Sequence, residues 1–227
     1  MRRFAGIRLG EDRISEESTL LQIGHLLEHH HLTEAIFQTV TEHLKHHRLL
    51  VKEGTLVDAT LIHAPSSTNN RDRARDPDMT STKKGNQWYF GRKAHIGTDA
   101  KGRVHSLTAT TAKAADCTPF EQLLQGQLGD RGYDCPGVHE ALKVRSGGDA
   151  IAFAADRASR SVTLRRRSSR RCRNLTARVE HPIRVLKRQF GYTKTRHRGL
   201  AKNTAHLHAL FAPVNLYATR YEKLGTG

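Results

Sequence analysis

The chain has 227 residues, 37% of them apolar, which is enough for one moderately large domain or a domain with a small appendage. No stretch approaches the roughly 20 apolar residues of a membrane helix, and residues 1–6 lack the features of a secretory signal, so we expect a cytoplasmic protein without a membrane anchor. Lys and Arg number 38 against 22 Asp and Glu, a formal charge of +16 that attracts polyanions, chiefly nucleic acid.

Two helices are expected near the start of the chain. Residues 15–30 place apolar side chains at helical spacing, with Ser15 in position to cap the first turn, and residues 33–47 repeat the pattern. They predict a helical hairpin with little to bury against by itself, and we interpret residues 1–52 as the remnant of a longer N-terminal helical region. The apolar stripes consist of Leu20, Ile23 and Leu27 in the first helix and of Ile36, Phe37, Val40 and Leu44 in the second.

Short strands follow the helices. Residues 56–62 form an apolar, β-like run with a single acid, Asp58, inside it. Residues 66–87 are rich in Asn, Asp, Arg and Lys, which is the composition of a loop. Two more strands are expected at residues 88–98 and 104–111, with a hairpin turn at residues 99–102 between them.

The second half of the chain adds helices. We expect a short helix at residues 119–124, a helix at 137–144, a short strand at 150–154, and helices at 170–190 and 203–220. Pro182 lies inside the stripe of residues 170–190, where it should kink the helix or mark a restart. The element order predicts an α/β fold over residues 53–220, a mixed β-sheet flanked by helices and preceded by the short helical hairpin.

Three acids stand out by their context. Asp58 is the only charge in an apolar strand, Asp130 lies in a Gly-Asp-Arg-Gly-Tyr turn, and Glu180 is the sole acid between Arg157 and Tyr221. Carboxylates from three separate elements could hold two Mg²⁺ or Mn²⁺ ions for displacement at phosphorus. Each acid also has a structural alternative: Asp58 could pair with a buried arginine, Asp130 could merely form the turn, and Glu180 could pair with Arg184.

Other metal patterns are weak. Cys117, Cys135 and Cys172 are far apart and form no C-x-x-C pair, which argues against a disulfide framework and a structural zinc site. Two histidine pairs have i, i+4 spacing, but neither has the H-E-x-x-H arrangement, so we interpret them as exposed helix residues. These pairs are His25 with His29 and His43 with His47. By contrast, the eight arginines between residues 157 and 173, with no acid among them, favour a surface that faces DNA.

Four phrases together resemble the DDE-type insertion-sequence transposases, and more narrowly the group whose last acid begins an E-x6-K motif. These phrases are residues 54–60, 83–97, 178–191 and 198–204. The resemblance implies an RNase H-like fold and an enzyme that uses Mg²⁺ or Mn²⁺, with two ions expected. Such an enzyme cuts double-stranded DNA at the ends of its element and joins the freed 3′-hydroxyls to target DNA. It would act as a homodimer or a larger assembly on DNA.

The resemblance assigns roles to individual residues. Asp58, Asp130 and Glu180 match the three catalytic, metal-binding acids, and Lys187 matches the lysine of the motif. Glu180 and Lys187 are seven residues apart, nearly two helical turns, so both lie on one face of the late helix. Arg184 and Arg188 would line the same groove and contact DNA together with Lys187.

The sequence also departs from the family pattern. Residues 125–129 form a poor strand before Asp130 because they contain two glycines. Thr176 stands where the motif usually has arginine, and residues 145–173 resemble the family poorly. An alternative is therefore a catalytically inactive, shortened copy that only binds DNA, and a third reading is a structure-specific nuclease of the same fold.

Overall fold

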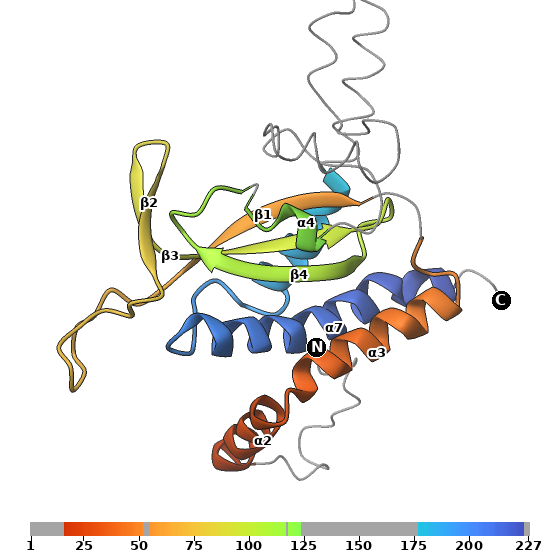
Figure 1. The fold of residues 1–227 in the computed structure, drawn as a ribbon. Helices are drawn as coiled ribbons and strands as arrows, with labels where there is room; N and C mark the ends of the chain where they lie inside the picture. Colours follow the sequence, from red (N-terminus) through yellow and green to blue (C-terminus); the bar gives the residue numbers. More distant parts are fainter. Residues whose placement is uncertain (1–15, 52–54, 117, 124–176, 225–227) are drawn as a thin grey trace, which may run out of the picture.

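The computed structural model describes residues 16–51, 55–116, 118–123 and 177–224, and Figure 1 shows how their elements are arranged. A mixed α/β architecture results, with helices on both sides of an antiparallel sheet, as expected for an RNase H-like fold. In chain order the elements are α2 (Glu17–His29), α3 (Leu32–His46), β1 (Leu56–His63), β2 (Thr80–Lys84), β3 (Gln87–Thr98), β4 (Val104–Thr111), α4 (Phe120–Leu123), a helix over residues 177–188, and α7 (Leu200–Leu224). The expected elements at 137–144 and 150–154 lie outside the described residues.

β3 is the central strand of the sheet. Its second half lies between β1 and β4, and its first half pairs with β2, each time in the antiparallel sense. Gly91 stands where the two halves meet, because it pairs with His63 of β1 and with Thr80 of β2. A Cβ at Gly91 would collide with the carbonyl oxygen of Ile62, so this close approach requires glycine. The hairpin of β2 and early β3 therefore extends beyond the main sheet (Figure 1).

β2 corrects the expectation of a loop throughout residues 66–87. Its five residues pair with Gln87–Gly91, and Gly85 and Asn86 form the two-residue turn between the strands. Gly85 has a φ of +61°, as a type II′ hairpin turn requires at its first central position. The polar composition of Thr80–Lys84 hid this strand, since most of its side chains face solvent.

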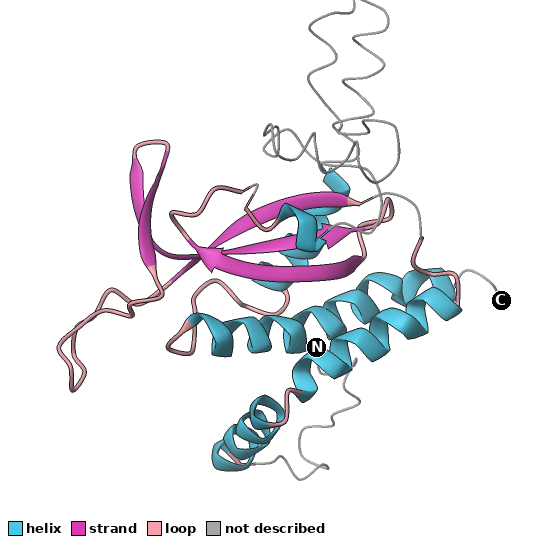
Figure 2. Ribbon diagram, viewed as in Figure 1, coloured by secondary structure: helices cyan, strands magenta, loops and turns pink. Residues whose placement is uncertain are grey.

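The main core lies between one face of the sheet and the helices packed on it. Leu56 and Ile62 of β1 and Ala94 and Ile96 of β3 are buried on this face, together with residues of α7 and of helix 177–188. Short α4 lies on the opposite face (Figure 2). Its Leu123 carbonyl oxygen would be 2.7 Å from a Cβ at Gly97. The helical residues of this core are Phe37, Val179, Ile183, Val185, Leu186, Leu207, Phe211, Ala212 and Val214.

The two N-terminal helices differ in how they pack. α3 lies beside α7 (Figure 1) and buries Phe37 and Leu44, and the ring of Phe37 meets that of His208 at 5.6 Å. α2 has no buried residue, although its apolar stripe has the predicted spacing. α3 thus finds in α7 the packing surface that the helical hairpin lacks by itself.

The late helices agree in place with the sequence and differ in their boundaries. The described part of the late helix runs from residue 177 through Pro182 to residue 188 without a restart. α7 begins at Leu200 instead of Asn203, because two carboxylates from the loop before β2 accept the first backbone N–H groups. Asp76 accepts from Gly199 at 2.7 Å, and Asp78 accepts from Leu200 at 2.9 Å.

Two further expectations concern membranes and histidines. None of the helices in the described part of the chain is both long and apolar enough to cross a bilayer. The histidine pairs of α2 and α3 are exposed, as expected, and among the described residues no three His, Cys, Asp or Glu side chains form a possible metal site.

Candidate active site

Asp58 lies in β1, directly opposite Ile96 of β3. Val57 before it and Thr60 two residues after it are buried and hold the strand in the sheet, while Asp58 itself is half-buried. Its Oδ1 atom accepts the backbone N–H of Ala59 at 2.7 Å. The strand thus holds a carboxylate at the boundary between core and solvent, where it remains within reach of a cation.

Helix 177–188 presents two kinds of surface. Val179, Ile183 and Leu186 recur at helical spacing and are buried against the sheet. Glu180 follows Val179 and is exposed, and Lys187 follows Leu186 and is half-buried. Glu180 and Lys187 therefore share one edge of the buried stripe, as their spacing predicts, and the exposed arginines Arg184 and Arg188 lie on the solvent side of the same helix.

Lys187 connects this helix to β1. Its Nζ donates a hydrogen bond to the carbonyl oxygen of Leu61 at 3.2 Å. Burial, together with the positive charge of Lys84, lowers the pKa of Lys187, while the Asp58 carboxylate acts in the opposite direction. The structure thus brings Asp58, Lys187 and Lys84, which come from three different elements, within electrostatic range of one another.

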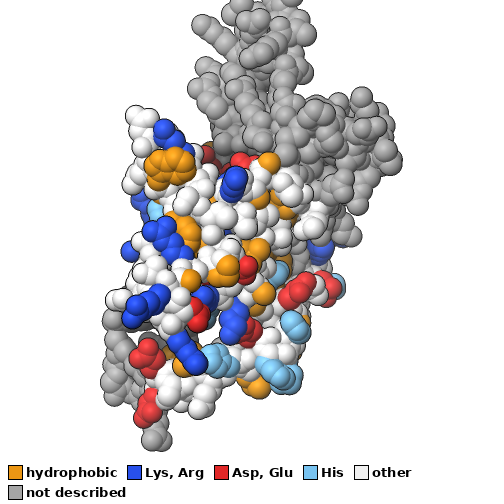
Figure 3. All heavy atoms as spheres, turned by 60° about the vertical axis from the view of Figure 1, so that its left-hand side comes forward, with side chains coloured by type: hydrophobic (Ala, Val, Ile, Leu, Met, Phe, Trp, Pro, Cys, Tyr) orange, Lys and Arg blue, Asp and Glu red, His pale blue; other side chains and the backbone are white. Residues whose placement is uncertain are grey.

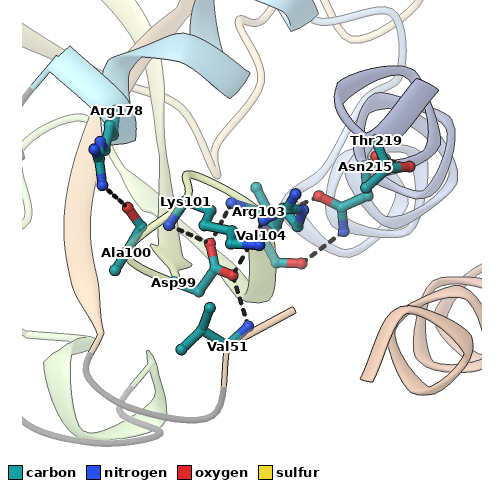
Figure 4. A network of polar contacts seen from close by, with 9 residues as sticks. All are labelled: Val51, Asp99, Ala100, Lys101, Arg103, Val104, Arg178, Asn215 and Thr219. Carbon is teal, nitrogen blue, oxygen red and sulfur yellow. Dashed lines mark hydrogen bonds and ion pairs between the residues drawn. The ribbon is translucent and has the colours of Figure 1, made fainter. Parts of the chain in front are cut away.

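The other end of the described helix is fixed at the turn between β3 and β4. Arg178 Nη1 donates to the carbonyl oxygen of Ala100 at 2.7 Å (Figure 4). The carbonyl oxygen of Arg178 lies so close to Gly102 that a Cβ there would approach it to 2.5 Å, and Gly102 has a φ of +80°. Because this turn adjoins Leu56 and Lys187 reaches Leu61, the helix runs alongside β1 in the same direction. Glu180 therefore lies toward the end of β1 that carries Asp58.

Buried polar contacts hold that turn in place (Figure 4). The Asp99 carboxylate accepts the backbone N–H groups of Val51, Lys101 and Arg103 at 2.8–2.9 Å. Asn215 of α7 binds both the N–H and the carbonyl of Val104, at 2.9 and 2.6 Å, where β4 begins. α7, the turn and helix 177–188 are thereby joined, and this fixes the position of the helix that carries Glu180.

Asp130, the second acid singled out in the sequence, lies outside the described residues. The described part of the candidate site therefore contains Asp58, Glu180 and the basic residues Lys84, Arg184, Lys187 and Arg188. Carboxylate oxygens are the ligands that hard divalent cations prefer, so the donor chemistry of Asp58 and Glu180 fits such an ion. The sequence interpretation missed Lys84, although the Gly85-Asn86 pair just before the strand expected at residues 88–98 is a hairpin signal that could have revealed it.

Comparison of the sequence with known protein families identifies the family of the chain. Residues 49–216 match the family described as "Transposase DDE domain". The matched range contains all four strands of the sheet and helix 177–188. The chain belongs to the DDE transposases. No solved structure matches it. DDE transposases act on DNA and generally use divalent metal ions, so the basic charge and the carboxylates of this transposase domain agree with its family.

Proposed function

We propose that this transposase cuts DNA at the ends of an insertion sequence and joins the ends to a target, in a reaction that depends on Mg²⁺ or Mn²⁺. The observation that carries the proposal is the convergence of β1 and helix 177–188. Arg178 donates to the carbonyl oxygen of Ala100 and Lys187 donates to that of Leu61, so the helix runs alongside β1. Glu180 and Lys187 therefore lie along the strand that contains Asp58. The catalytic domain would span residues 53–220, preceded by residues 1–52 as a helical appendage.

Each residue would have a distinct task. Asp58, Glu180 and Asp130 would hold two metal ions, which supply charge stabilisation for the attacking and leaving oxygens at phosphorus. Lys187, fixed by its bond to Leu61, would hold a non-bridging phosphate oxygen beside the carboxylates. Arg184 and Arg188 are exposed and would bind neighbouring phosphates. Bringing two element ends together requires at least a homodimer on DNA.

A cleavage assay tests the proposal. The full chain is incubated with labelled DNA that carries the ends flanking its own gene, with Mg²⁺ or Mn²⁺ and then with EDTA. We expect nicks at the element boundary only with metal, and their loss in Asp58→Asn without loss of DNA binding. Asp72→Asn is the matched control, because Asp72 is exposed in the loop before β2, and this variant should cut as the wild type does.

The other outcomes discriminate between the alternatives. Equal cleavage by Asp58→Asn would overturn the assignment of Asp58. DNA binding without nicks with either metal would favour the catalytically inactive copy. The sequence feature that motivates this alternative is the glycine-containing segment 125–129 before Asp130, which is a poor strand. Preference for branched over linear DNA would favour a structure-specific nuclease.

A further inference from the structure

The hairpin of β2 and early β3 carries an aromatic residue that the proposed chemistry does not use. Trp88 is 68% exposed, and it is the only tryptophan of the chain. It lies directly opposite Lys83, and the next pair toward the turn is Lys84 with Gln87. An exposed indole thus lies beside exposed Lys83 on one face of the hairpin, and exposed Lys84 lies on the other face next to the turn.

The exposure of Trp88 is unusual for this strand. Phe90, two residues further along the same face, is half-buried and lies under the guanidinium of Arg75, whose Cζ is 5.3 Å from the ring centroid. Each later residue on that face, from Arg92 to Thr98, is buried. With 68% of its surface exposed, the indole contributes little to the core, and an amphipathic ring in this position is suited to contact a surface partner.

The hairpin is continuous with the strand that supports the candidate active site. Trp88 precedes Lys93, the partner of Leu61, by five residues, and it precedes Ile96, the partner of Asp58, by eight. At about 3.3 Å per residue, these separations are at most about 17 and 26 Å. In a B-form duplex this is a distance of roughly 5 to 8 base pairs.

The charge around the hairpin fits a nucleic acid strand. Lys84 lies close enough to Lys187 for its charge to act on it, so basic side chains continue from the site toward the turn. Figure 3 views the side of the molecule on which the hairpin lies in Figure 1, and Lys and Arg side chains are spread over this face, with apolar side chains among them. Exposed aromatic rings between basic residues are the usual platform for stacking bases of single strands.

We propose that this hairpin is a base-stacking element, in which Trp88 stacks on an unpaired DNA base while Lys83, on the same face, binds an adjacent phosphate and Lys84 adds positive charge next to the turn. The inference rests on the proposed function, since it takes the DNA substrate of that function as its ligand. The unpaired base would lie several base pairs from the phosphate held at Lys187. The ring would therefore favour DNA that is distorted or unpaired at that position over a regular duplex.

Intrinsic fluorescence tests the proposal at a single residue, because Trp88 is the only tryptophan. The full chain is titrated with a single-stranded oligonucleotide, with a duplex containing one unpaired base, with a regular duplex of equal length, and with heparin as a polyanion without bases. Labelled DNA measures binding independently by anisotropy. We expect strong, saturable quenching by the first two ligands, weaker quenching by the regular duplex, and none by heparin, although heparin binds.

Variants separate stacking from charge and from catalysis. Trp88→Ala should weaken binding to the duplex with an unpaired base by roughly 5- to 100-fold and binding to the regular duplex far less. Trp88→Phe should recover part of the loss, and Asp58→Asn should be quenched as the wild type is. The exposed site makes Trp88→Ala a mild change for folding, which circular dichroism checks.

Three results would overturn the inference in distinguishable ways. DNA that binds without changing the emission or the acrylamide accessibility of Trp88 contradicts stacking and leaves the proposed function intact. Emission that changes with protein concentration alone identifies Trp88 as a contact between protein molecules. A chain that binds no DNA contradicts the proposed function itself, and the inference with it.

Discussion

Asp99 carries a charge at a position that is fully buried. Three backbone N–H groups donate to its carboxylate, and Arg103 Nη1 lies 3.7 Å from its Oδ2. In Asp99→Asn, an amide NH₂ takes the place of one accepting oxygen. At least one backbone N–H then faces another donor, and the negative charge beside Arg103 is lost. We expect a loss of about 3 kcal/mol in the free energy of unfolding, measured by urea denaturation.

An exposed aspartate provides the matched control for this residue. Asp72 pairs with Arg198 at 3.3 Å, and both side chains are at least half exposed. Exposed pairs of this kind contribute about 0–1 kcal/mol, so Asp72→Asn should hardly shift the denaturation midpoint. Equal midpoints for Asp99→Asn and Asp72→Asn would show that the buried carboxylate does not stabilise the turn that positions helix 177–188.

At the scale of elements, β3 and β4 each contain a buried histidine. Burial lowers the pKa of His95 to about 4, against an opposing effect of the Asp116 carboxylate. Burial likewise lowers the pKa of His105 to about 4, against an opposing effect of Asp99. Both rings are engaged in the sheet region, His95 with Thr110 at 2.7 Å and His105 with Ser106 at 3.0 Å. Both are therefore neutral in the folded sheet at pH 7.

These lowered values make the sheet sensitive to acid. The unfolded chain takes up protons below a pH of about 6.5, whereas the folded sheet does so only near 4, so the free energy of unfolding falls as the pH falls through this window. Each histidine should contribute a loss of about 1.6 kcal/mol between pH 6.5 and 5. Urea denaturation of His105→Gln should show a flatter dependence on pH than the wild type, and exposed His30→Gln should not. Parallel curves for all three proteins would contradict this account.

The elements that the sequence predicted are those whose signal is local. Strands at residues 88–98 and 104–111 agree with β3 and β4 within one residue, because apolar and β-branched residues are concentrated there. The start of α7 at Leu200 could not be predicted, since its capping carboxylates Asp76 and Asp78 are more than 120 residues away in the chain. Tertiary contacts of this kind leave no periodic pattern in the sequence.

The candidate site was predictable in part for the same reason. The spacing of Glu180 and Lys187 on one helix face follows from helical geometry alone, and the structure agrees with it. The approach of Lys187 to Asp58 comes from packing of the helix on β1 through Val179, Ile183 and Leu186, which no spacing reveals. Asp130 lies outside the described residues, and its role stays a prediction.

At the scale of the whole molecule, the formal charge of +16 should dominate binding of the DNA substrate that we propose. Each phosphate neutralised by a basic side chain releases counterions, so the logarithm of the binding constant falls linearly with the logarithm of salt concentration. The slope counts phosphate contacts, whereas the affinity alone does not. It is therefore the measurement that connects the charge of the chain to particular residues of helix 177–188.

We expect Arg184 and Arg188 to account for two of these contacts. Replacing both with glutamine should reduce the magnitude of the slope on duplex DNA by about 1.8, since each contact contributes about 0.9. Lys202→Gln is the control, because Lys202 lies on α7 with Glu28 of α2 only 3.8 Å away, and its loss should leave the slope unchanged. If the double variant keeps the wild-type slope, DNA does not lie along this helix, and the positive charge acts through another face. If Lys202→Gln lowers the slope as much per charge removed as the double variant does, the charge acts as a diffuse field without a defined groove, and phosphate positioning beside Asp58 would lose its physical basis.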